Sequence, residues 1–204
     1  MRGNLYVISS PAGGGKTTIV NLLLQELNFL RRVITYTTRQ KRKNEIDGVD
    51  YVFLKKEEFE KLISENAFLE YAVVHGNYYG TPKKETSELL EKGYDVLLVI
   101  DVQGMKQVKQ IYPEVVTIFI IPPSIEELVN RMKLRGESVE DIEKRLKTAE
   151  KEIPHWKEYD YIVINDNLLE AKDSIKSIII AERCRTKKFD LSLIKDEKLK
   201  SLMI

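Results

Sequence analysis

The chain has one cysteine, two histidines and almost no excess of charge of either sign. A single cysteine, Cys184, excludes an internal disulfide and a cysteine-based zinc site. His75 and His155 lie far apart in the sequence without partners at metal-binding spacing, so we expect no metal site there. With 33 basic and 32 acidic residues the net charge is +1, a balance that argues against binding to bulk nucleic acid or to an anionic membrane surface.

Long apolar runs are also missing from the sequence. No stretch approaches the length of a membrane span, and residues 1–4 lead directly into a short apolar run, so we expect no signal peptide. One cysteine fits a reducing compartment. The length of 204 residues suits one domain with insertions. We therefore expect a soluble, cytoplasmic protein with a sizeable core. We also expect Trp156 and Cys184 to pack against that core.

The most informative segment that is present is SSPAGGGKTT at residues 9–18, which follows the apolar run 5–8. A strand, a glycine-rich turn, a Gly-Lys-Thr triplet and a helical pattern predict a phosphate-binding loop. Lys16 is expected to reach the β- and γ-phosphates, and the Thr17 hydroxyl to bind Mg²⁺. The strict pattern begins with glycine where this chain has Ser10. The alternative, a glycine-rich turn without a ligand, does not explain the flanking strand and helix. The residues expected to contact a nucleoside triphosphate here are Ser10, Pro11, Ala12, Gly13, Gly14, Gly15, Lys16, Thr17 and Thr18.

Four short apolar runs predict strands buried on both faces, at residues 5–8, 96–100, 115–121 and 161–164. Helical patterns separate them and begin with the capping residues Ser124, Ser138 and Asn167. Near-continuous apolar strands alternating with helices are typical of a parallel sheet covered by helices. The expected fold is therefore α/β with three layers.

Residues 34–90 interrupt this rhythm with polar loops, short aromatic strands and two helices, the second beginning at Thr81-Pro82. We interpret the segment as an inserted subdomain with a mixed or antiparallel sheet. The tail after Phe189 is charged with scattered Leu and Ile. It is expected to form a short amphipathic helix packed on the body, or to fray.

The inserted segment also carries a series of polar residues that suits an anionic ligand. Arg39 and Arg42 lie three apart near tyrosines, and guanidinium groups pair with phosphate oxygens in a bidentate manner. Glu70 lies within an apolar strand, where burial of a carboxylate is costly unless it has partners. Two interpretations of Glu70 are open: it faces solvent, or it accepts hydrogen bonds from a base such as guanine. The full series is Thr35, Arg39, Arg42, Tyr51, Glu70, Tyr79 and Thr81.

Taken together, the motifs of this sequence resemble those of the guanylate kinase family. The resemblance covers residues 3 to about 186 and rests on SSPAGGGKTT, TTRQKR at 37–42, GVDY at 48–51, FLEY at 68–71, GNYYGT at 76–81, IDVQG at 100–104, IPPS at 121–124, LRG at 134–136, KRL at 144–146 and VIND at 163–166. The resemblance implies transfer of a phosphoryl group from ATP to GMP, giving ADP and GDP, with Mg²⁺. It also implies that Arg39, Arg42, Tyr51 and Tyr79 hold the GMP phosphate, and that Glu70, Thr35 and Thr81 recognise guanine.

The resemblance also assigns residues to the ATP half of the site. Asp101 follows a buried strand. It is expected to organise Mg²⁺, directly or through water, or the bound nucleotides, or simply to cap the next helix. Arg135 and Arg145 are expected on a mobile lid, where they reach the ATP phosphates. Arg131, at helical spacing from Arg135, is either a third such residue or a surface residue. Asn165 is expected near the adenine, or as a turn residue. The residues expected to act in catalysis are Lys16, Arg39, Asp101, Arg135 and Arg145.

One departure from the family pattern concerns the acid that many members carry two positions before Asp101, where this chain has Val99. The expected parts are a core of residues 1–33 and 91–189, a GMP-binding subdomain at 34–90, a lid at 124–150 and a tail at 190–204. The expected partners are ATP and GMP, in a monomer or homodimer. Two rival hypotheses remain: a catalytically inactive binding module of guanylate kinase type, and a kinase for another small phosphorylated acceptor.

Overall fold

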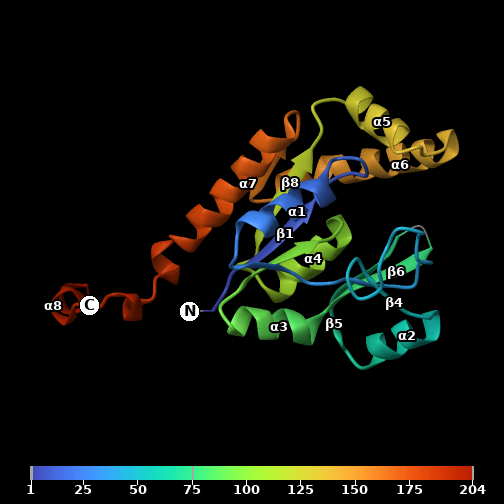
Figure 1. Ribbon diagram of the computed structural model, residues 1–204. Coiled ribbons are helices and arrows are strands. Elements are labelled where there is room, and N and C mark those ends of the chain that lie inside the picture. Colours follow the sequence, from blue (N-terminus) through green and yellow to red (C-terminus); the bar gives the residue numbers. More distant parts are fainter. Residues whose placement is uncertain (1, 75, 204) are drawn as a thin grey trace.

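A five-stranded parallel sheet forms the centre of the molecule (Figure 1). The computed structural model describes residues 2–74 and 76–203. The strand order is β2-β7-β1-β8-β9, so the chain reverses direction of winding beside β1, as in doubly wound sheets. The strands are β1 (Leu5–Ser9), β2 (Leu30–Arg32), β7 (Asp95–Val99), β8 (Val116–Ile121) and β9 (Tyr161–Ile164). The four predicted strands are confirmed, and β2 is an additional edge strand.

Helices cover both faces of this sheet, as the apolar strands predicted. Helices α1 (Lys16–Glu26) and α7 (Leu168–Arg183) cover one face, where Leu23 and Ile175 are fully buried against alternate strand residues. Helices α3 (Lys83–Glu91) and α4 (Val102–Ile111) cover the other face. Because each face has its own buried cluster, the core is a three-layer α/β fold, in agreement with the prediction.

The pairing of β1 with β7 determines where the site forms. Their parallel register aligns Ile8 with Val99, so both strands end at the same edge of the sheet. The glycine-rich loop follows β1 at this edge, and Asp101 follows β7. Ligands of doubly wound sheets bind outside the carboxyl ends of the strands, which makes this edge the place to look for a site.

A second, four-stranded sheet lies apart from the first, with the order β4-β3-β6-β5. Its pairs are antiparallel except for the parallel pair β3 and β4, so it is mixed. Its elements are β3 (Tyr36–Thr37), β4 (Val52–Phe53), α2 (Lys56–Ser64), β5 (Phe68–Val74) and β6 (Asn77–Pro82). Pro82 ends β6 and α3 begins at Lys83, one residue later than the Pro-first helix that we predicted.

Stacked aromatic rings form the small core of this second sheet. The ring of Phe59 on α2 stacks on Phe68 at 4.4 Å and on Tyr78 at 5.1 Å between centroids. A Cβ atom at Gly80 would come within 2.8 Å of both phenylalanine rings. Glycine is therefore the residue that lets the rings approach the sheet.

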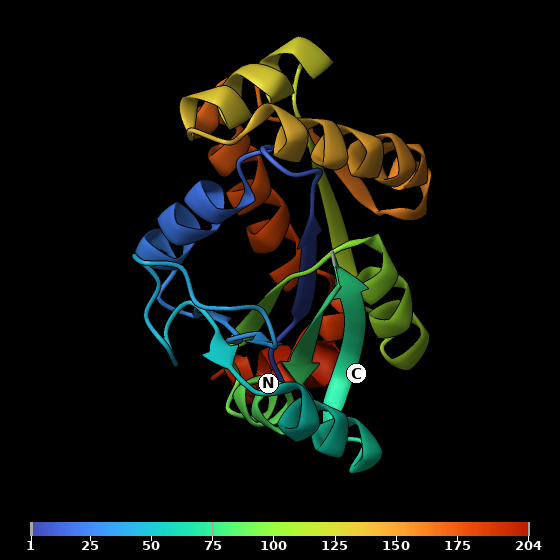
Figure 2. The ribbon, with the colours of Figure 1, turned by 90° about the vertical axis from the view of Figure 1, so that its right-hand side faces the viewer.

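Two antiparallel helices, α5 (Ile125–Leu134) and α6 (Val139–Glu152), form an arm at the opposite end of the molecule from the second sheet (Figure 2). The predicted caps are confirmed: Ser124 accepts from the backbone N–H of Glu127, and Ser138 from that of Asp141. Gly136 joins the helices with a φ of +75°, a left-handed conformation that favours glycine. A separate apolar cluster, which includes Leu128 and Ile142, holds the pair together.

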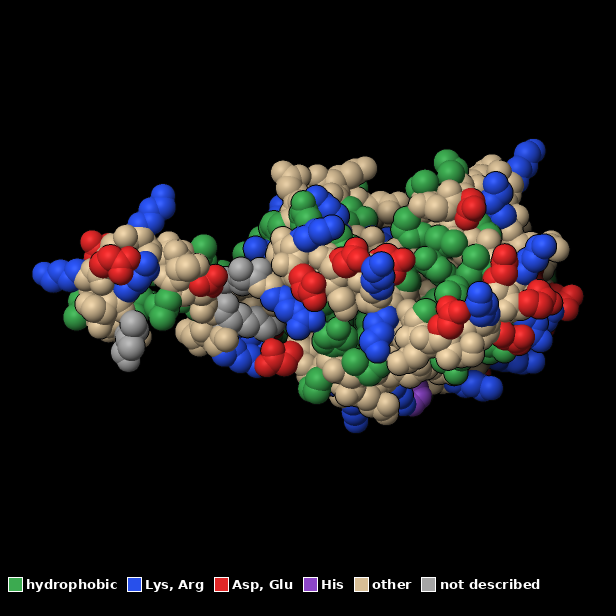
Figure 3. Space-filling view, turned by 90° about the horizontal axis from the view of Figure 1, so that it is seen from below, with side chains coloured by type: hydrophobic (Ala, Val, Ile, Leu, Met, Phe, Trp, Pro, Cys, Tyr) green, Lys and Arg blue, Asp and Glu red, His purple; other side chains and the backbone are tan. Residues whose placement is uncertain are grey.

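The chain after α7 leaves the body of the molecule. Two 3-10 turns (Thr186–Lys188 and Leu191–Leu193) lead to α8 (Glu197–Leu202), which stands apart from the body in Figures 1 and 3. A tail helix was predicted, but its packing on the body was not borne out, since Leu193 and Leu202 are exposed. Within the described chain, no helix combines the length and apolar character needed to cross a membrane.

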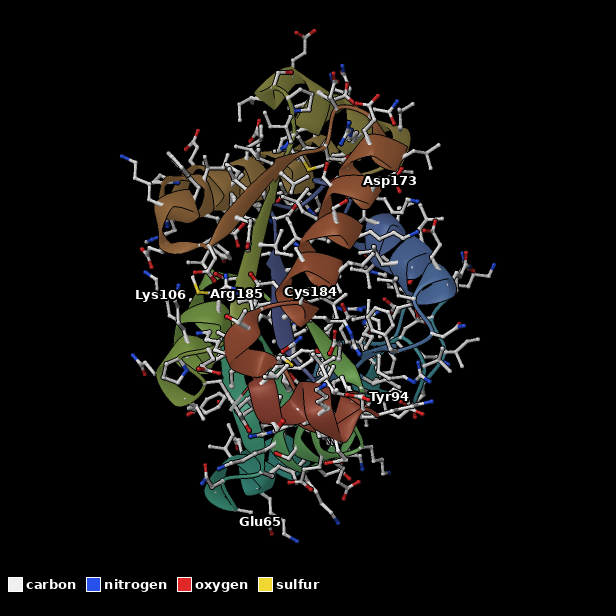
Figure 4. All side chains as sticks on the ribbon, turned by 90° about the vertical axis from the view of Figure 1, so that its left-hand side faces the viewer. Glu65, Tyr94, Lys106, Asp173, Cys184 and Arg185 are labelled. Atoms are coloured by element: carbon white, nitrogen blue, oxygen red, sulfur yellow. The ribbon has the colours of Figure 1, made fainter. Side chains whose placement is uncertain are left out.

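The expectation that Trp156 and Cys184 pack against the core is wrong. Trp156 lies in the 3-10 turn Ile153–Glu158 and is 40% exposed. Cys184 directly follows α7 as its C-cap and is exposed, next to Arg185 (Figure 4). Both residues follow the last buried turn of a helix, so local hydrophobicity does not decide their environment.

The aromatic stack yields a test of the second sheet. We expect Phe59→Ala to lower the free energy of unfolding by about 3–5 kcal/mol, because it removes a fully buried ring and leaves a cavity. Urea unfolding followed by circular dichroism provides the readout. Leu202→Ala is the control, since this leucine is 77% exposed and its truncation should change little. Equal unfolding curves for the two variants would contradict the packing described.

Candidate active site

The glycine-rich loop between β1 and α1 has the backbone of an anion-binding turn. Gly13 and Gly15 adopt φ values of +86° and +94°, which side chains rarely tolerate. A Cβ atom at Gly14 would overlap the hydroxyl of Ser10. That hydroxyl donates to the carbonyl of Pro11 at 2.8 Å. Ser10 therefore replaces the first glycine of the strict pattern without disturbing the turn, because Gly14 leaves room for its side chain.

Asn165, after β9, supports this loop from behind. Its side-chain Nδ2 donates to the carbonyl of Gly14 at 2.8 Å, and the residue is 2% exposed. A Cβ atom at Gly15 would collide with the same amide. The side chain thus holds the loop, a role that our sequence analysis did not assign; its proposed contact with adenine remains a prediction.

A single cavity of about 590 Å³ joins the loop to the second sheet and to the α5–α6 arm. Figure 2 shows how these three parts are arranged in the fold. Of the predicted site residues, the cavity wall includes Ser10, Pro11, Ala12, Gly13, Gly14, Gly15, Lys16, Thr17, Thr35, Arg39, Arg42, Tyr51, Glu70, Tyr79, Asp101, Arg135 and Arg145. Residues separated by more than a hundred positions are therefore brought to one site by the fold.

Lys16 is the central cation of the cavity. Its ammonium donates to the carbonyl of Ser10. Burial lowers the pKa of Lys16 from its ordinary value, while the carboxylates of Glu152 and Asp101 oppose this shift and Arg135 adds to it. The lysine thus sits among groups of both signs, in a position where an anionic ligand would compensate the cost of its burial.

Asp101 is the N-cap of α4. Its Oδ1 accepts from the backbone N–H of Gly104 at 2.8 Å, so the capping interpretation is confirmed. The capping bond does not exclude a role toward a cation, because a carboxylate has several acceptor sites. Val99 lines the cavity without charge. Glu152, at the end of α6, supplies a second carboxylate near Lys16 and Asp101.

Arg39 is held in the cavity by three different partners. Its Nε donates to the hydroxyl of Tyr79 at 3.1 Å, its Nη1 to the carbonyl of Gln40 at 2.7 Å, and its Nη2 to Glu45 at 2.7 Å. The guanidinium also lies 5.4 Å from the ring centre of Tyr51. These contacts fix the orientation of the guanidinium before any ligand binds.

Glu45 stabilises a turn in the loop that carries both predicted phosphate-binding arginines. Its second oxygen accepts from the backbone N–H of Arg42 at 2.8 Å, and its own N–H donates to the carbonyl of Arg42 at 3.1 Å. Burial by itself would raise the pKa of Glu45. The hydrogen bonds from Arg39 and Arg42 outweigh it and lower the pKa of Glu45 below its ordinary value. The carboxylate therefore stays ionised beside Arg39.

Glu70 is 4% exposed, so the interpretation that it faces solvent is wrong. A bulge in β5 between Phe68 and Glu70 changes the register with β6, and bulges redirect side chains. The Thr81 hydroxyl donates to Glu70 at 2.5 Å. Burial raises the pKa of Glu70 to about 7; hydrogen bonds from Thr81 oppose this rise and the nearby Asp101 carboxylate adds to it.

Four predicted residues are not on the cavity wall: Thr18, Thr81, Arg131 and Asn165, whose contact with the loop is described above. Thr81 reaches the cavity only through Glu70. Thr18 is exposed on α1. Arg131 donates to Glu127 at 2.6 Å and to the carbonyl of Asn165 at 2.9 Å, so it braces the loop support. His75, where we expected no metal site, lies outside the residues that the structure describes.

The two predicted lid arginines line the cavity, but they differ in burial and in their partners. Arg145 pairs with Glu137 at 3.0 Å and is partly buried, whereas Arg135 is exposed at the end of α5. Sequence reasoning missed the further lining residues Glu45, Asp141, Lys144 and Glu152. A search for acids on the cavity-facing side of the predicted lid helix would have found Asp141 and Glu152, which have helical spacing.

The donor atoms at the loop edge suit Mg²⁺. Thr17 and Asp101 both line the cavity with oxygen atoms. In the part of the chain that the structure describes, no three His, Cys, Asp or Glu side chains form a metal-binding group. Mg²⁺ is usually held by one or two protein oxygens, with waters and substrate phosphates completing its shell, so this sparse donor set fits the ion.

Comparison with known proteins agrees with the geometry of the site. The guanylate kinase family model matches residues 2–182. The chain is 51% identical over 185 residues to the guanylate kinase of Caldanaerobacter subterraneus subsp. tengcongensis, covering 90% of each chain. It is 50% identical over 194 residues to the guanylate kinase of Clostridium tetani, covering 95% of this chain and 93% of that one.

A solved structure is similar over the same extent. The crystal structure of guanylate kinase from Anaplasma phagocytophilum matches with a TM-score of 0.78 at 39% identity, covering 91% of this chain and 88% of that chain. The family match, the two relatives and the shared fold all extend over nearly the whole sequence. The chain therefore belongs to the guanylate kinase family.

Proposed function

We propose that the protein transfers the γ-phosphoryl group of ATP to GMP, giving ADP and GDP. The observation that carries the proposal is that one cavity is lined both by the glycine-rich loop and by the buried Glu70. The loop suits the phosphates of a donor nucleotide. The carboxylate suits the base of an acceptor, and family membership supports the pairing of ATP with GMP.

Guanine fits Glu70 by its hydrogen-bond pattern. The base presents an N1–H and an exocyclic amino group side by side, and an ionised carboxylate accepts from both. Adenine lacks this donor pair, so it leaves the buried carboxylate unsatisfied, which is the situation in which a site discriminates strongly. Thr35 and Thr81 complete this part of the site, since Thr35 lines the cavity and Thr81 bonds Glu70.

The acceptor phosphate is assigned to the basic and phenolic groups on the same wall. Arg39 offers an oriented guanidinium. Arg42, Tyr51 and Tyr79 line the cavity around it. An ionised oxygen of this phosphate attacks the γ-phosphorus of ATP, the bond to the β-phosphate oxygen breaks, and the electron pair leaves with ADP. Because the attacking oxygen is already ionised, the step needs no general base.

The donor half would hold ATP through the loop and the arm. Backbone N–H groups of the loop and Lys16 neutralise phosphate charge, and Arg135 and Arg145 approach from the arm. Thr17, and Asp101 through water, would hold Mg²⁺, which shields charge on the β- and γ-phosphates when bound. Thr18, Arg131 and Asn165 remain proposed ATP contacts.

We further propose a division of labour among the parts of the chain. Residues 34–90 would carry GMP, residues 124–150 would close as a lid, and the core would hold ATP. Closure would remove water from the transferring group and strengthen the electrostatic interactions around it. A cytoplasmic location, and a monomer or homodimer, complete the proposal.

A coupled assay of ADP release tests the activity. With Mg-ATP as donor, we expect turnover with GMP and much slower turnover with AMP or UMP, because only guanine supplies the donor pair for Glu70. Turnover of another phosphorylated acceptor in preference to GMP would identify a different kinase. No turnover of any acceptor by a folded protein that binds GMP would identify a binding module.

Replacement of Lys16 tests the donor half. We expect Lys16→Ala to lower kcat by about 10²–10³-fold, as for loss of one preorganised charge-stabilising donor, with GMP affinity little changed. The coupled assay gives kcat, and thermal unfolding shows whether the fold is intact. Lys84→Ala is the control, because Lys84 is exposed on α3. Near-normal turnover of a folded Lys16→Ala protein would refute the assigned role.

The raised pKa of Glu70 predicts how GMP affinity depends on pH. Guanine requires the ionised carboxylate, and burial raises the pKa of Glu70 in the free protein to about 7. Below pH 7 a proton must leave before GMP binds, so Kd should rise as pH falls, approaching about tenfold per pH unit. Above pH 8 it should level off.

Calorimetric titration with GMP between pH 6 and 9 measures this dependence. Glu70→Gln is the matched variant: it keeps the shape but loses the titrating group, so the titration of the GMP phosphate remains and only the Glu70 contribution disappears. Parallel pH profiles for the two proteins would show that Glu70 does not titrate on binding.

A further inference from the structure

Helix α4 forms the wall behind Glu70, and Gly104 is the point of contact. A Cβ atom at position 104 would lie 2.6 Å from Oε2 of Glu70 and 3.1 Å from its Cδ. Real Cβ atoms do not come that close to a neighbour. Gly104 has no left-handed backbone, so conformation does not require glycine here. Glycine is required here because a side chain would occupy the space of the Glu70 carboxylate. It is present although glycine within a helix costs about 1 kcal/mol relative to alanine.

Gln107, one turn further along α4, fixes the backbone next to Glu70. Its Oε1 accepts from the N–H of Tyr71 at 3.2 Å, and its Nε2 donates to the carbonyl of Tyr71 at 2.8 Å. Strand β5 is an edge strand, so these two backbone groups have no neighbouring strand on that side. The carboxamide offers the same donor and acceptor as a peptide group and takes the place of a further strand.

Glu70 is therefore held from three directions. Thr81 bonds one of its oxygens from β6, Gly104 gives the other oxygen a close surface, and Gln107 ties the adjacent residue to the core. Gly104 also donates its N–H to Asp101. The first turns of α4 thus connect the acceptor half of the cavity to the donor half.

We propose that Gly104 and Gln107 are positioning residues that set the selection of guanine, because together they fix the depth and direction of the Glu70 carboxylate against α4. The inference rests on the proposed function of Glu70. Two hydrogen bonds to one base edge require both carboxylate oxygens to be placed within a few tenths of an ångström. A shift of about 1 Å can cost about a hundredfold. Neither residue needs to touch GMP to have this effect.

The first experiment compares binding of GMP and IMP by calorimetry. IMP keeps the N1–H but lacks the amino group, so the ratio of the two affinities reports the second hydrogen bond. For Gly104→Ala and Gln107→Ala we expect GMP affinity to fall by at least about tenfold and the GMP-to-IMP ratio to approach one, with ATP affinity unchanged. Gln110→Ala is the control, since Gln110 is exposed on the same helix. A general loss of structure would weaken ATP binding as well.

The second experiment isolates the steric contact without any nucleotide. In a double-mutant cycle, Gly104→Ala should lower the urea midpoint when Glu70 is present. It should raise the midpoint in a Glu70→Ala protein, because alanine favours the helix once the carboxylate is gone. The cycle also gives an answer if Gly104→Ala alone fails to fold, since the double variant should then fold.

The outcomes separate the two claims. If the unmodified protein does not bind GMP, the proposed function fails and the selection role fails with it. If it binds GMP but both α4 variants keep the GMP-to-IMP ratio, the inference is overturned while the proposed function stands. An additive cycle would also overturn it, because Gly104 and Glu70 would then not be in energetic contact.

Discussion

The parallel pairing of β1 with β7 is the constraint on which the site depends. It brings the end of β1, with its glycine-rich loop, beside the end of β7, with Asp101. From Asp101 the chain enters α4, whose third residue contacts Glu70. One strand pair therefore positions the donor half directly and the acceptor half through a single helix. A change of register here would separate the two halves by the spacing of a residue, about 3.3 Å.

Three of the cations in the cavity have acidic partners within the protein. Arg39 pairs with Glu45 and Arg145 with Glu137, and Lys16 lies near Glu152 and Asp101. The cations are thus oriented but not left as isolated buried charges, which would be costly. Phosphate groups entering the cavity would meet preoriented donors, and the reorganisation required at the moment of transfer would be small.

Features that depend on residues close together in the sequence were predicted better than features that depend on residues far apart. The loop, the four apolar strands and the helix caps are local patterns, and they were predicted correctly. Strand β2 was missed because Leu30–Arg32 is short and carries two arginines. It is a strand because it pairs with β7, an effect that no local pattern shows.

The environment of individual side chains was harder to predict. Position alone could not decide whether Glu70 faces solvent, because a bulge and helix α4 determine its burial. Gln107 gave no signal, since its partner Tyr71 lies 36 residues away. Asn165 was placed near the adenine by resemblance, but its contact with the loop is visible only in three dimensions. Residues that can bind ligands or take part in catalysis can thus be recognised in the sequence. The residues that orient them are identified only from tertiary contacts.

The central claim is that the cavity holds two nucleotides at once with their phosphates facing each other. The most direct measurement is the calorimetric affinity of a compound that links adenosine to guanosine through a chain of phosphates. If both halves are occupied together, the linked compound should bind at least about a hundredfold more tightly than ATP or GMP alone. An affinity no higher than that of the tighter single nucleotide would contradict the account.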